Sequence, residues 1–334
     1  MSGLAESLDR VAFDARFSGV VRVDRGNAIE FAAAYGFADR RHRIPNRMDT
    51  QFGIASGVKG LTALTVMTLV QEGRLELATT ARSMLGRDLP LIDDSVTVEH
   101  LLTHRSGIGD YLDEEIERPI TDHVMTVPPH ELDSTEAYLK VLDGYPMKFQ
   151  PGERFSYSNG GYVVLALIAG RVAGTPFHEV VERRVCQPAG MADTAFLRSD
   201  ELPGRAATGY LDEDGLRTNV LHLPVRGSGD GGIYSTAADF SALWTSLFAG
   251  RIVATDLVAE MVRRHSDAPG HSGPYGLGFW LHESRELVEL HGYDAGASFT
   301  SVHDPTRRLT FTVMSNTSEG AWPLVEMLHE ALMA

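Results

Sequence analysis

Lysine, cysteine and net positive charge are scarce in this chain, and each shortage excludes a class of partner or compartment. Its 334 residues include 45 Asp and Glu against 30 Lys and Arg, which gives a formal net charge of −15. Nucleic acids and anionic membranes are bound by clustered Lys and Arg, and because the sequence shows no such cluster we expect neither as a partner. Cys186 is the only cysteine. No internal disulfide can form, and the cysteine usage indicates no adaptation to an oxidising compartment.

The sequence also lacks a membrane-spanning run and a secretory signal. The longest apolar run, Tyr162 to Ala169, is far shorter than the roughly 20 residues that cross a bilayer. Glu6, Asp9 and Asp14 interrupt the N-terminal stretch, which has neither the basic start nor the apolar block of a signal peptide. We therefore predict a cytoplasmic protein that acts on small molecules or peptides, and we make no prediction of its oligomeric state.

Only three lysines are present, and one of them lies in an unusual place. Lys59 follows Ser56 by three residues, and the mostly apolar residues from Leu61 to Val70 continue the segment. A helix that is apolar on nearly all faces must be buried, and residues three apart share one face, so the hydroxyl and the amine can meet. Burial lowers the pKa of a lysine, which makes Lys59 a candidate base for the Ser56 proton. Arginine could not take this role because it does not deprotonate.

The Ser-x-x-Lys spacing has a second reading, in which neither residue is catalytic. Ser56 would then cap the N-terminus of the helix, and Lys59 would extend its ammonium along the helix to the surface. The spacing alone does not separate the two readings.

Two later motifs add side chains for acid–base chemistry. Tyr157 and Asn159 lie in a Gly-rich turn before an apolar segment, and a phenol near an ammonium is expected to have a depressed pKa and to shuttle a proton. The alternative is a packed loop tyrosine, with Asn159 as a helix N-cap. His291 lies where a strand over 287–290 is expected to break into a turn, and its imidazole could hydrogen-bond a substrate there. A single histidine at a strand end is, however, more often structural.

Hydrophobic periodicity predicts strands near both ends of the chain and helices between them. The expected strands cover 19–23, 28–35, 276–282, 287–290, 298–303 and 309–314. The expected helices cover 4–12, 98–102, 134–142, 161–173, 176–186, 236–248, 255–264 and 324–332, besides the one that begins near Ser56.

These elements predict an α+β fold. One antiparallel sheet, covered by the two terminal helices, would be formed by residues 1–75 together with 265–334. Residues 76–264 would form an inserted, mostly helical lobe, and the active site would lie in the cleft between the two lobes.

The widely spaced order Ser-x-x-Lys, Tyr-x-Asn and His-Gly resembles the serine β-lactamase and penicillin-binding-protein superfamily. The resemblance is closest to the class C β-lactamase-like branch with its esterases, D-amino-acid peptidases and carboxypeptidases, and it covers nearly the whole chain. It includes the connecting segments 100–107, 231–236 and 275–280. Together these motifs are highly specific for the fold and much less specific for the substrate.

The resemblance implies a role for each motif. Ser56 is the acylated nucleophile, and Lys59 and Tyr157 share the general-base work. Asn159 orients Lys59 and the substrate amide, and His291 stands in the third motif.

The third motif departs from the family pattern of Lys or His, any residue, Gly, because Tyr293 stands in its last position. The backbone N–H of Ser56 and one near Asp294 would form the oxyanion hole beside it. A side chain at Tyr293 that points into the cleft would crowd the strand that normally contacts the substrate, so we expect it to restrict substrate size and to disfavour β-lactam turnover. Tyr111 is a further candidate for the substrate pocket.

The favoured interpretation is a serine hydrolase without metal or cofactor, which forms an acyl-enzyme at Ser56 from a small ester or amide. Ester hydrolysis is favoured because the better leaving group of an ester makes few demands on a general acid. A D-amino-acid peptidase or DD-carboxypeptidase and a β-lactamase are the alternatives among enzymes. A catalytically silent peptide-binding module is the alternative from a different class.

Three further patterns superficially suggest a metal site, a nucleotide loop or another hydrolase fold, and each lacks a required part. His100 and His104 are spaced like a zinc-binding pair, but no third ligand is evident. The Gly-rich segment 227–232 follows no expected strand and precedes no lysine, which favours a turn in the cleft wall over a nucleotide loop. No Gly-x-Ser-x-Gly sequence occurs, which excludes the nucleophile elbow of α/β-hydrolases.

Overall fold

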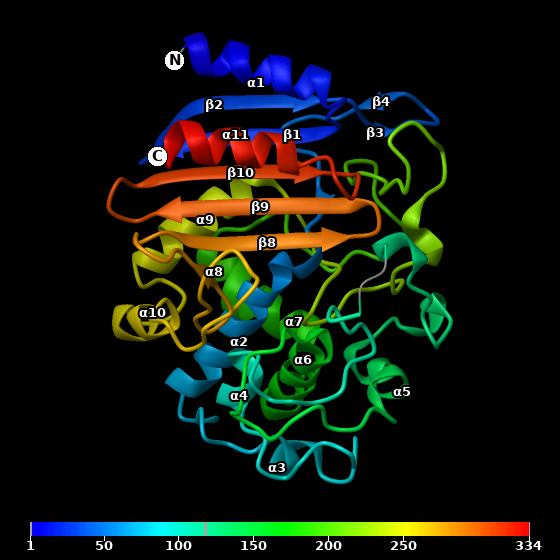
Figure 1. Ribbon diagram of the computed structural model, residues 1–334, viewed down its shortest axis with the longest axis vertical. Coiled ribbons are helices and arrows are strands. Elements are labelled where there is room, and N and C mark those ends of the chain that lie inside the picture. The colour runs from blue at the N-terminus through cyan, green and yellow to red at the C-terminus, as the bar shows by residue number, and fades with distance from the viewer. Residues whose placement is uncertain (1, 117–118, 334) are drawn as a thin grey trace.

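A six-stranded antiparallel sheet is the framework of the molecule (Figure 1). The computed structural model describes residues 2–116 and 119–333. In their spatial order the strands of this sheet are β2 (Ala28–Tyr35), β1 (Gly19–Arg25), β10 (Leu309–Ser315), β9 (Ala297–Asp304), β8 (Val288–Asp294) and β7 (Trp280–Leu281). Two small two-stranded sheets pair β3 (Phe37–Asp39) with β4 (Ile44–Pro45) and β5 (Phe52–Gly53) with β6 (Tyr234–Ser235).

Helices make up most of the remaining regular structure. The α-helices are α1 (Ser2–Asp14), α2 (Val58–Gln71), α3 (Ala81–Leu85), α4 (Val98–Leu102), α5 (Leu139–Leu142), α6 (Asn159–Ala173), α7 (Phe177–Val181), α8 (Gln187–Ala189), α9 (Ala237–Phe248), α10 (Thr255–Met261) and α11 (Trp322–Leu332). A π-helical turn, Glu182–Cys186, joins α7 to α8, and short 3₁₀ turns lie elsewhere, among them η1 (Ala55–Gly57).

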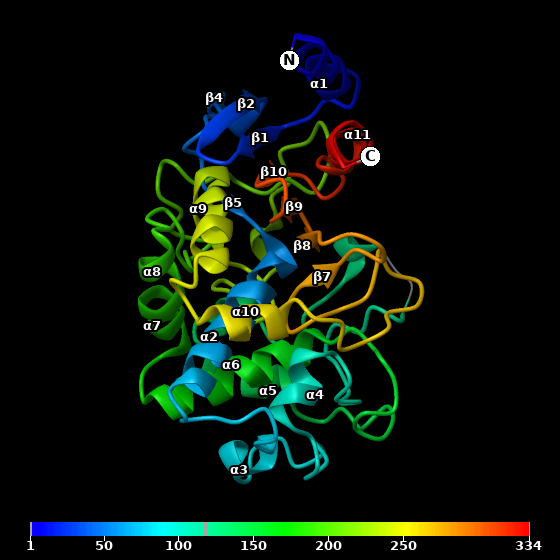
Figure 2. The same cartoon turned by 90° about the vertical axis from the view of Figure 1, so that its left-hand side faces the viewer.

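The two terminal helices cover one face of the sheet. Leu8 of α1, Phe311 of β10 and Leu324 of α11 are fully buried in one apolar cluster between the helices and the strands. Figure 2 shows α1 and α11 on one side of the sheet and α9 on the other. On that other side, the indole N–H of Trp244 in α9 donates to the Ser301 hydroxyl of β9 at 2.8 Å. The predicted α+β fold, with an antiparallel sheet between terminal helices, is confirmed.

Helix α2 carries the Ser-x-x-Lys motif into the centre of the molecule. Every residue from Val58 to Leu69 is buried, as its nearly continuous apolar sequence predicts. The helix packs against α6 and lies close to β8, where Gly60 faces the side chain of Leu290. The division into 1–75 with 265–334 and 76–264 stays a prediction, and a single hydrophobic core runs across it.

Two of the expected strands differ from the structure near the cleft. The strand expected over 276–282 shrinks to Trp280–Leu281, because Gly278 takes a φ of +90° and the Gly276 N–H closes a turn on the Phe279 carbonyl. The strand expected to end at 290 continues to Asp294, because residues 291–294 keep pairing with β9. The chain therefore turns at Ala295 and Gly296, and His291 lies within the strand instead of at its end.

Among the described residues, no single helix is long and apolar enough to cross a membrane. In the part of the chain that the structure describes, one pair of helical segments, α6 and 177–189, reaches that length and composition, but the pair is bent by 79°. The residues of α6 from Asn159 to Ala169 are buried in the core.

Candidate active site

Ser56 lies in the tight turn η1, immediately before α2. The preceding residue, Ala55, has a φ of +46°, a left-handed conformation that costs a non-glycine residue about 1 kcal/mol or more. Neither this turn nor α2 has a side-chain N-cap, so Ser56 is not used as a cap. Lys59 is only 2% exposed and does not extend to the surface. The second reading of the Ser-x-x-Lys spacing is therefore wrong.

The Lys59 amine is bound by three oxygens. Its Nζ atom lies 2.8 Å from the Ser56 hydroxyl, from the Asn159 side-chain carbonyl and from the backbone carbonyl of Asp230. Burial lowers the pKa of Lys59, and nearby carboxylates, Asp230 and Glu114 foremost, oppose that shift. Two of the three oxygens are acceptors only. When Lys59 is neutral, its lone pair can therefore face only Ser56, which makes this hydroxyl the proton donor to the amine.

Tyr157 is also hydrogen-bonded to Ser56, but its ionisation differs from our expectation. Burial raises the pKa of Tyr157 well above its ordinary value, and Glu114 and Tyr275 raise it further. The predicted depression of this pKa is wrong, because desolvation outweighs the neighbouring ammonium, which lies 4.9 Å from the ring centre. At neutral pH the phenol therefore keeps its proton and is suited to act as an acid.

Stacked rings hold Tyr157 in place. The His104 ring stacks on it with centroids 4.3 Å apart, and the Trp280 ring lies 6.1 Å away at an interplanar angle of 9°. His104 is buried, and its Nδ1 accepts the Ser158 N–H at 3.0 Å, so the neutral ring carries its proton on Nε2. Burial, with a smaller contribution from Lys59, lowers the pKa of His104 well below its ordinary value.

Asn159 is the first residue of α6, and Ser158, not Asn159, is the N-cap. The Asn159 Oδ1 accepts from Lys59, as the family role implies. Its Nδ2 donates to the Leu112 carbonyl at 3.1 Å and to the Glu114 carboxylate at 3.0 Å. Both donors of the amide are thus already used, so a substrate carbonyl can bind Asn159 only by displacing one of these acceptors.

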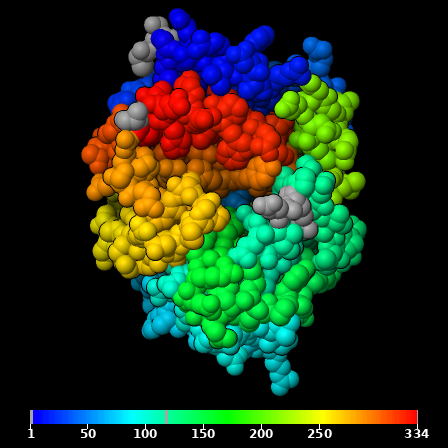
Figure 3. Space-filling view, in the orientation of Figure 1, coloured from blue at the N-terminus to red at the C-terminus, as the bar shows by residue number. Residues whose placement is uncertain are grey.

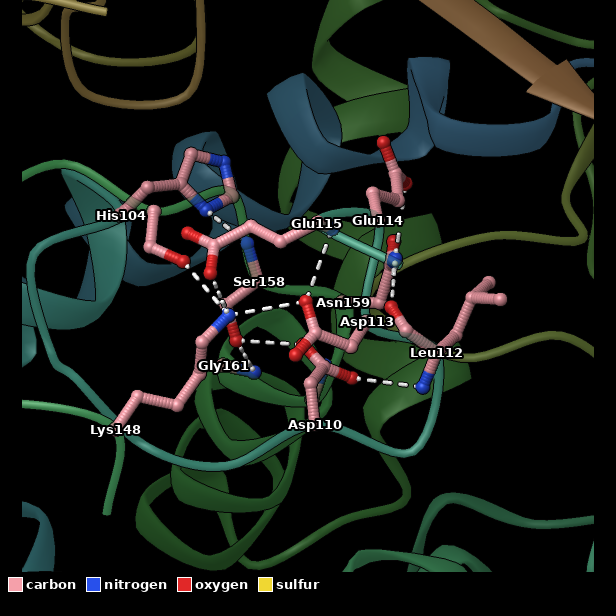
Figure 4. A network of polar contacts seen from close by, with 12 residues as sticks. His104, Asp110, Leu112, Asp113, Glu114, Glu115, Lys148, Ser158, Asn159 and Gly161 are labelled. Carbon is pink, nitrogen blue, oxygen red and sulfur yellow. Dashed lines mark hydrogen bonds and ion pairs between the residues drawn. The ribbon is translucent and has the colours of Figure 1, made fainter. Parts of the chain in front are cut away.

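The segment 110–115 reaches Asn159 because two sets of contacts anchor it (Figure 4). Asp110 is buried, accepting from the Ser158 hydroxyl at 2.8 Å and from the Gly160 N–H at 2.9 Å. Lys148 pairs with Asp113 at 3.0 Å and with Glu115 at 2.9 Å. Together these contacts place Glu114 at the mouth of the cleft.

The edge of β8 packs tightly against η1 at Gly292. A Cβ atom added to Gly292 would lie 2.0 Å from the Ile54 carbonyl oxygen and 3.1 Å from the Gly57 nitrogen. The close approach between β8 and η1 therefore requires a glycine at position 292. Tyr293 borders the cleft, and its predicted restriction of substrate size stays a prediction. The two predicted oxyanion donors are the N–H of Ser56, which lies in η1, and an N–H near Asp294, the last residue of β8. Their role as an oxyanion hole stays a prediction.

Tyr293 and His291 border the cleft from the same side of β8. The Tyr293 phenol donates to Glu319 at 2.6 Å, and its ring lies 6.0 Å from that of Trp322 in α11. His291 has both ring nitrogens engaged, Nε2 with the Glu289 carboxylate at 2.9 Å and Nδ1 with the Thr300 hydroxyl at 3.1 Å. Its predicted hydrogen bond to a substrate would require one of these partners to be released.

Two cavities meet at Ser56, which lines both. The inner cavity has a volume of about 1070 Å³ including its mouth and is bordered by Tyr111, Asp230 and Asp294. The outer groove is bordered by Tyr157 and Trp280, among others. Figure 3 shows a hollow between the orange and red C-terminal strands and helix and the green and cyan segments below them. Tyr111 lies at the predicted pocket, where its hydroxyl donates to the Asp230 carboxylate.

Sequence reasoning missed three contributors to this site. The Gly-rich segment 227–232 does line the cleft, but its Asp230 also supplies a carbonyl to Lys59. From other loops, Glu114 accepts a hydrogen bond from Asn159, and His104 stacks on Tyr157. The available signals were the acidic residues that follow Tyr111 and the aspartate between the glycines at 229 and 231. Neither pattern indicates which distant residue it contacts in the folded chain.

Comparison with known proteins agrees with this geometry. The profile of the Beta-lactamase family matches residues 8–332. Esterase EstB of Burkholderia gladioli is 30% identical over 317 residues, which cover 83% of this chain and 79% of that protein. PbpX of Bacillus subtilis is 29% identical over 269 residues, or 79% of this chain, and D-aminopeptidase of Brucella anthropi is 28% identical over 309 residues, or 91% of this chain. The chain spans 62% of the length of PbpX and 56% of that of D-aminopeptidase.

A solved structure extends the likeness to the whole fold. The penicillin binding protein from Bacillus halodurans is 37% identical and superposes with a TM-score of 0.90, covering 97% of this chain and 99% of that one. With the profile match along nearly the entire sequence, and with Ser56, Lys59 and Tyr157 in contact, the chain belongs to the Beta-lactamase family, within the penicillin-binding-protein-like superfamily of serine hydrolases.

Proposed function

We propose that this protein hydrolyses small esters, and secondarily amides, through an acyl-enzyme at Ser56. The observation that supports this most directly is the 2.8 Å contact between the Ser56 hydroxyl and the buried amine of Lys59. Esters are favoured because a good leaving group needs little help from an acid, and an esterase, EstB, is among the relatives.

In the acylation step, the Ser56 oxygen attacks the substrate carbonyl carbon while its proton passes to the neutral Lys59 amine. The carbonyl oxygen gains the negative charge, which the N–H of Ser56 and one near Asp294 would stabilise. As the tetrahedral intermediate collapses, the bond to the leaving group breaks, and the Tyr157 hydroxyl hands a proton to the departing oxygen or nitrogen. The Tyr157 phenolate then takes back a proton from the Lys59 ammonium, whose Nζ atom lies 4.9 Å from the centre of the Tyr157 ring, so that both groups return to their starting forms.

Deacylation repeats the sequence with water as the nucleophile. Water adds to the acyl carbon and gives one proton to the same base, and the bond to the Ser56 oxygen then breaks. Ser56 regains a proton, and the free acid leaves. No metal or redox cofactor enters this scheme.

A second candidate is hydrolysis of amides of the kind that a D-amino-acid peptidase would cleave. The high pKa of Tyr157 supports it, because a protonated phenol can supply the acid that an amine leaving group requires. A D-aminopeptidase is also among the relatives. Assignment to the class C branch, turnover of β-lactams and a silent peptide-binding module are further alternatives, of which the last is disfavoured by the intact contacts of Ser56.

The test is covalent labelling with a fluorophosphonate, together with hydrolysis of p-nitrophenyl butyrate. We expect one adduct by intact-mass spectrometry and loss of both adduct and turnover in Ser56→Ala, since the nucleophile is gone. Equal labelling of the wild type and of a folded Ser56→Ala variant would overturn the assignment.

A further inference from the structure

His104 holds the loop that carries Tyr157 at three consecutive residues. Its backbone carbonyl accepts the Ser156 N–H at 2.9 Å, and its ring Nδ1 accepts the Ser158 N–H at 3.0 Å. Between these two residues in the chain is Tyr157, whose ring stacks on that of His104 with centroids 4.3 Å apart. One side chain and its own carbonyl therefore fix both the backbone around Tyr157 and the plane of its ring.

His104 is itself anchored in the core of the molecule, shortly after the end of α4. The Tyr162 hydroxyl of α6 donates to the Leu102 carbonyl at 2.9 Å, and the Ser266 hydroxyl donates to the Thr103 carbonyl at 2.8 Å. The rings of His104 and Tyr162 lie 4.9 Å apart. The support beneath the Tyr157 loop therefore belongs to the packed helices and not to the walls of the cleft.

Two features of His104 are unfavourable for stability. Its φ of +55° is a left-handed conformation that residues other than glycine rarely adopt. The residue is only 1% exposed, and its Nε2 atom, which carries the ring proton, has no hydrogen-bond partner among the residues that the structure describes. A buried donor without an acceptor destabilises the fold. Backbone strain and an unsatisfied donor at one residue beside a reacting group indicate a functional constraint on that residue.

We propose that His104 is a positioning residue, which holds the Tyr157 hydroxyl where it can give its proton to the leaving group. This role rests on the proposed function, in which Tyr157 is the acid. A phenol ring turns about its side-chain bonds unless packing fixes it, and a misplacement of about 1 Å in a reacting group can slow catalysis by about 10²-fold. His104 borders neither cavity, so it acts through Tyr157 and not by contact with the substrate.

The test is a series of aryl butyrates whose leaving groups run from p-nitrophenol through phenol to p-methoxyphenol. A poorer leaving group depends more on an acid, so a misplaced Tyr157 makes kcat/KM fall more steeply along the series. His104→Asn removes the stacked ring, keeps an oxygen acceptor for the Ser158 N–H, and tolerates the left-handed conformation. We expect it to lose roughly tenfold with p-methoxyphenyl butyrate and less than about twofold with p-nitrophenyl butyrate. His104→Phe, which keeps a ring but loses the acceptor, should also steepen the series.

A double-mutant cycle separates positioning from a general effect on folding. Tyr157→Phe should steepen the series by itself, and adding His104→Asn should then change each rate by less than about twofold, because the two residues act as one unit. His303→Asn is the matched control. His303 is also buried, its ring stacks on that of Trp244 at an interplanar angle of 6°, and it borders neither cavity. This control should leave the series unchanged, whatever it does to urea unfolding.

The outcomes separate this proposal from the proposed function. If the folded His104 variants lose the same factor with every ester, or if their losses add to those of Tyr157→Phe, the positioning role is refuted and the acyl-enzyme stands. The same holds if Tyr157→Phe leaves the series unchanged, since Tyr157 is then not the acid. If no ester is turned over and Ser56 is not labelled by a fluorophosphonate, the acyl-enzyme fails, and the positioning role fails with it.

Discussion

Lys59 shows how one residue determines the chemistry at this site. Its three acceptors satisfy an ammonium completely, and only Ser56 among them can return a hydrogen bond to a neutral amine. We expect Lys59→Arg to lose activity toward p-nitrophenyl butyrate almost as fully as Lys59→Ala, because a guanidinium keeps the charge but cannot accept the proton. Steady-state kinetics of both variants measure this. Recovery of most activity by arginine would make Lys59 an electrostatic anchor.

Tyr157 acts, in our proposal, through its proton and not through a phenolate. Tyr157→Phe should therefore slow anilide hydrolysis by roughly 10²-fold and slow hydrolysis of an activated ester much less, because only the amine leaving group requires an acid. Kinetics on both substrate classes test this. Equal losses on the two classes would instead assign Tyr157 to the base side of the reaction.

The pH dependence of the acylation step follows from the same two residues. Burial lowers the pKa of Lys59, so kcat/KM should rise with pH through that lowered pKa, as the ammonium becomes an amine. The raised pKa of Tyr157 keeps its proton in place, so no fall is expected up to about pH 9. A pH profile with p-nitrophenyl butyrate checks the rising limb, and a profile with an anilide checks that Tyr157 keeps its proton. Anilide hydrolysis that declines between neutral pH and pH 9 would contradict the assignment of Tyr157 as the acid.

At the scale of elements, the contact between β8 and η1 sets the distance between the strand edge and the nucleophile. Gly292→Ala should push the two apart, since the new Cβ would overlap the Ile54 carbonyl and the strand cannot yield without shifting the sheet. We expect a loss of stability of about 1–3 kcal/mol by urea unfolding and a larger proportional loss of ester turnover.

Gly204→Ala is the matched control for this substitution, because a Cβ at Gly204 has no neighbour within 4 Å. It should leave both unfolding and turnover near the wild-type values. Wild-type activity in Gly292→Ala would show that β8 does not need this close approach.

At the scale of the whole molecule, acidic groups buried beside the cleft make stability depend on pH. The pKa of Asp294 is raised to about 7, so the folded state holds this proton more tightly than the unfolded chain does. The stabilisation that this bound proton gives the folded state is fully present below about pH 4 and is lost as the pH rises through about 7. The free energy of unfolding of Asp294→Asn should therefore rise relative to that of the wild type by roughly 3 kcal/mol between pH 4.5 and 7.5.

Urea unfolding at several pH values measures this difference, with Glu326→Gln as a control that removes one charge from an exposed position. A constant difference between Asp294→Asn and the wild type across this range would show that Asp294 titrates normally in the folded state.

Local patterns determined much of this protein. The meeting of Ser56 and Lys59 follows from a spacing of three residues at the start of a helix, and the buried α2 follows from its apolar sequence. The order of strands and helices follows from periodicities of two and 3.6 residues, although β7 is shorter and β8 is longer than expected. These features depend on neighbours in sequence, which a sequence displays directly.

Contacts between distant segments were decided only by the tertiary structure. Asp230 reaches Lys59 across 171 positions, and Glu114 reaches Asn159 across 45. The pKa of Tyr157 was misjudged because its burial and its acidic neighbours outweigh the one ammonium that the motif order suggested. Gly292 lies against η1 because the pairing of β8 with β9 continues past His291. Desolvation and strand register depend on what the folded chain brings alongside a residue, and no local pattern contains that information.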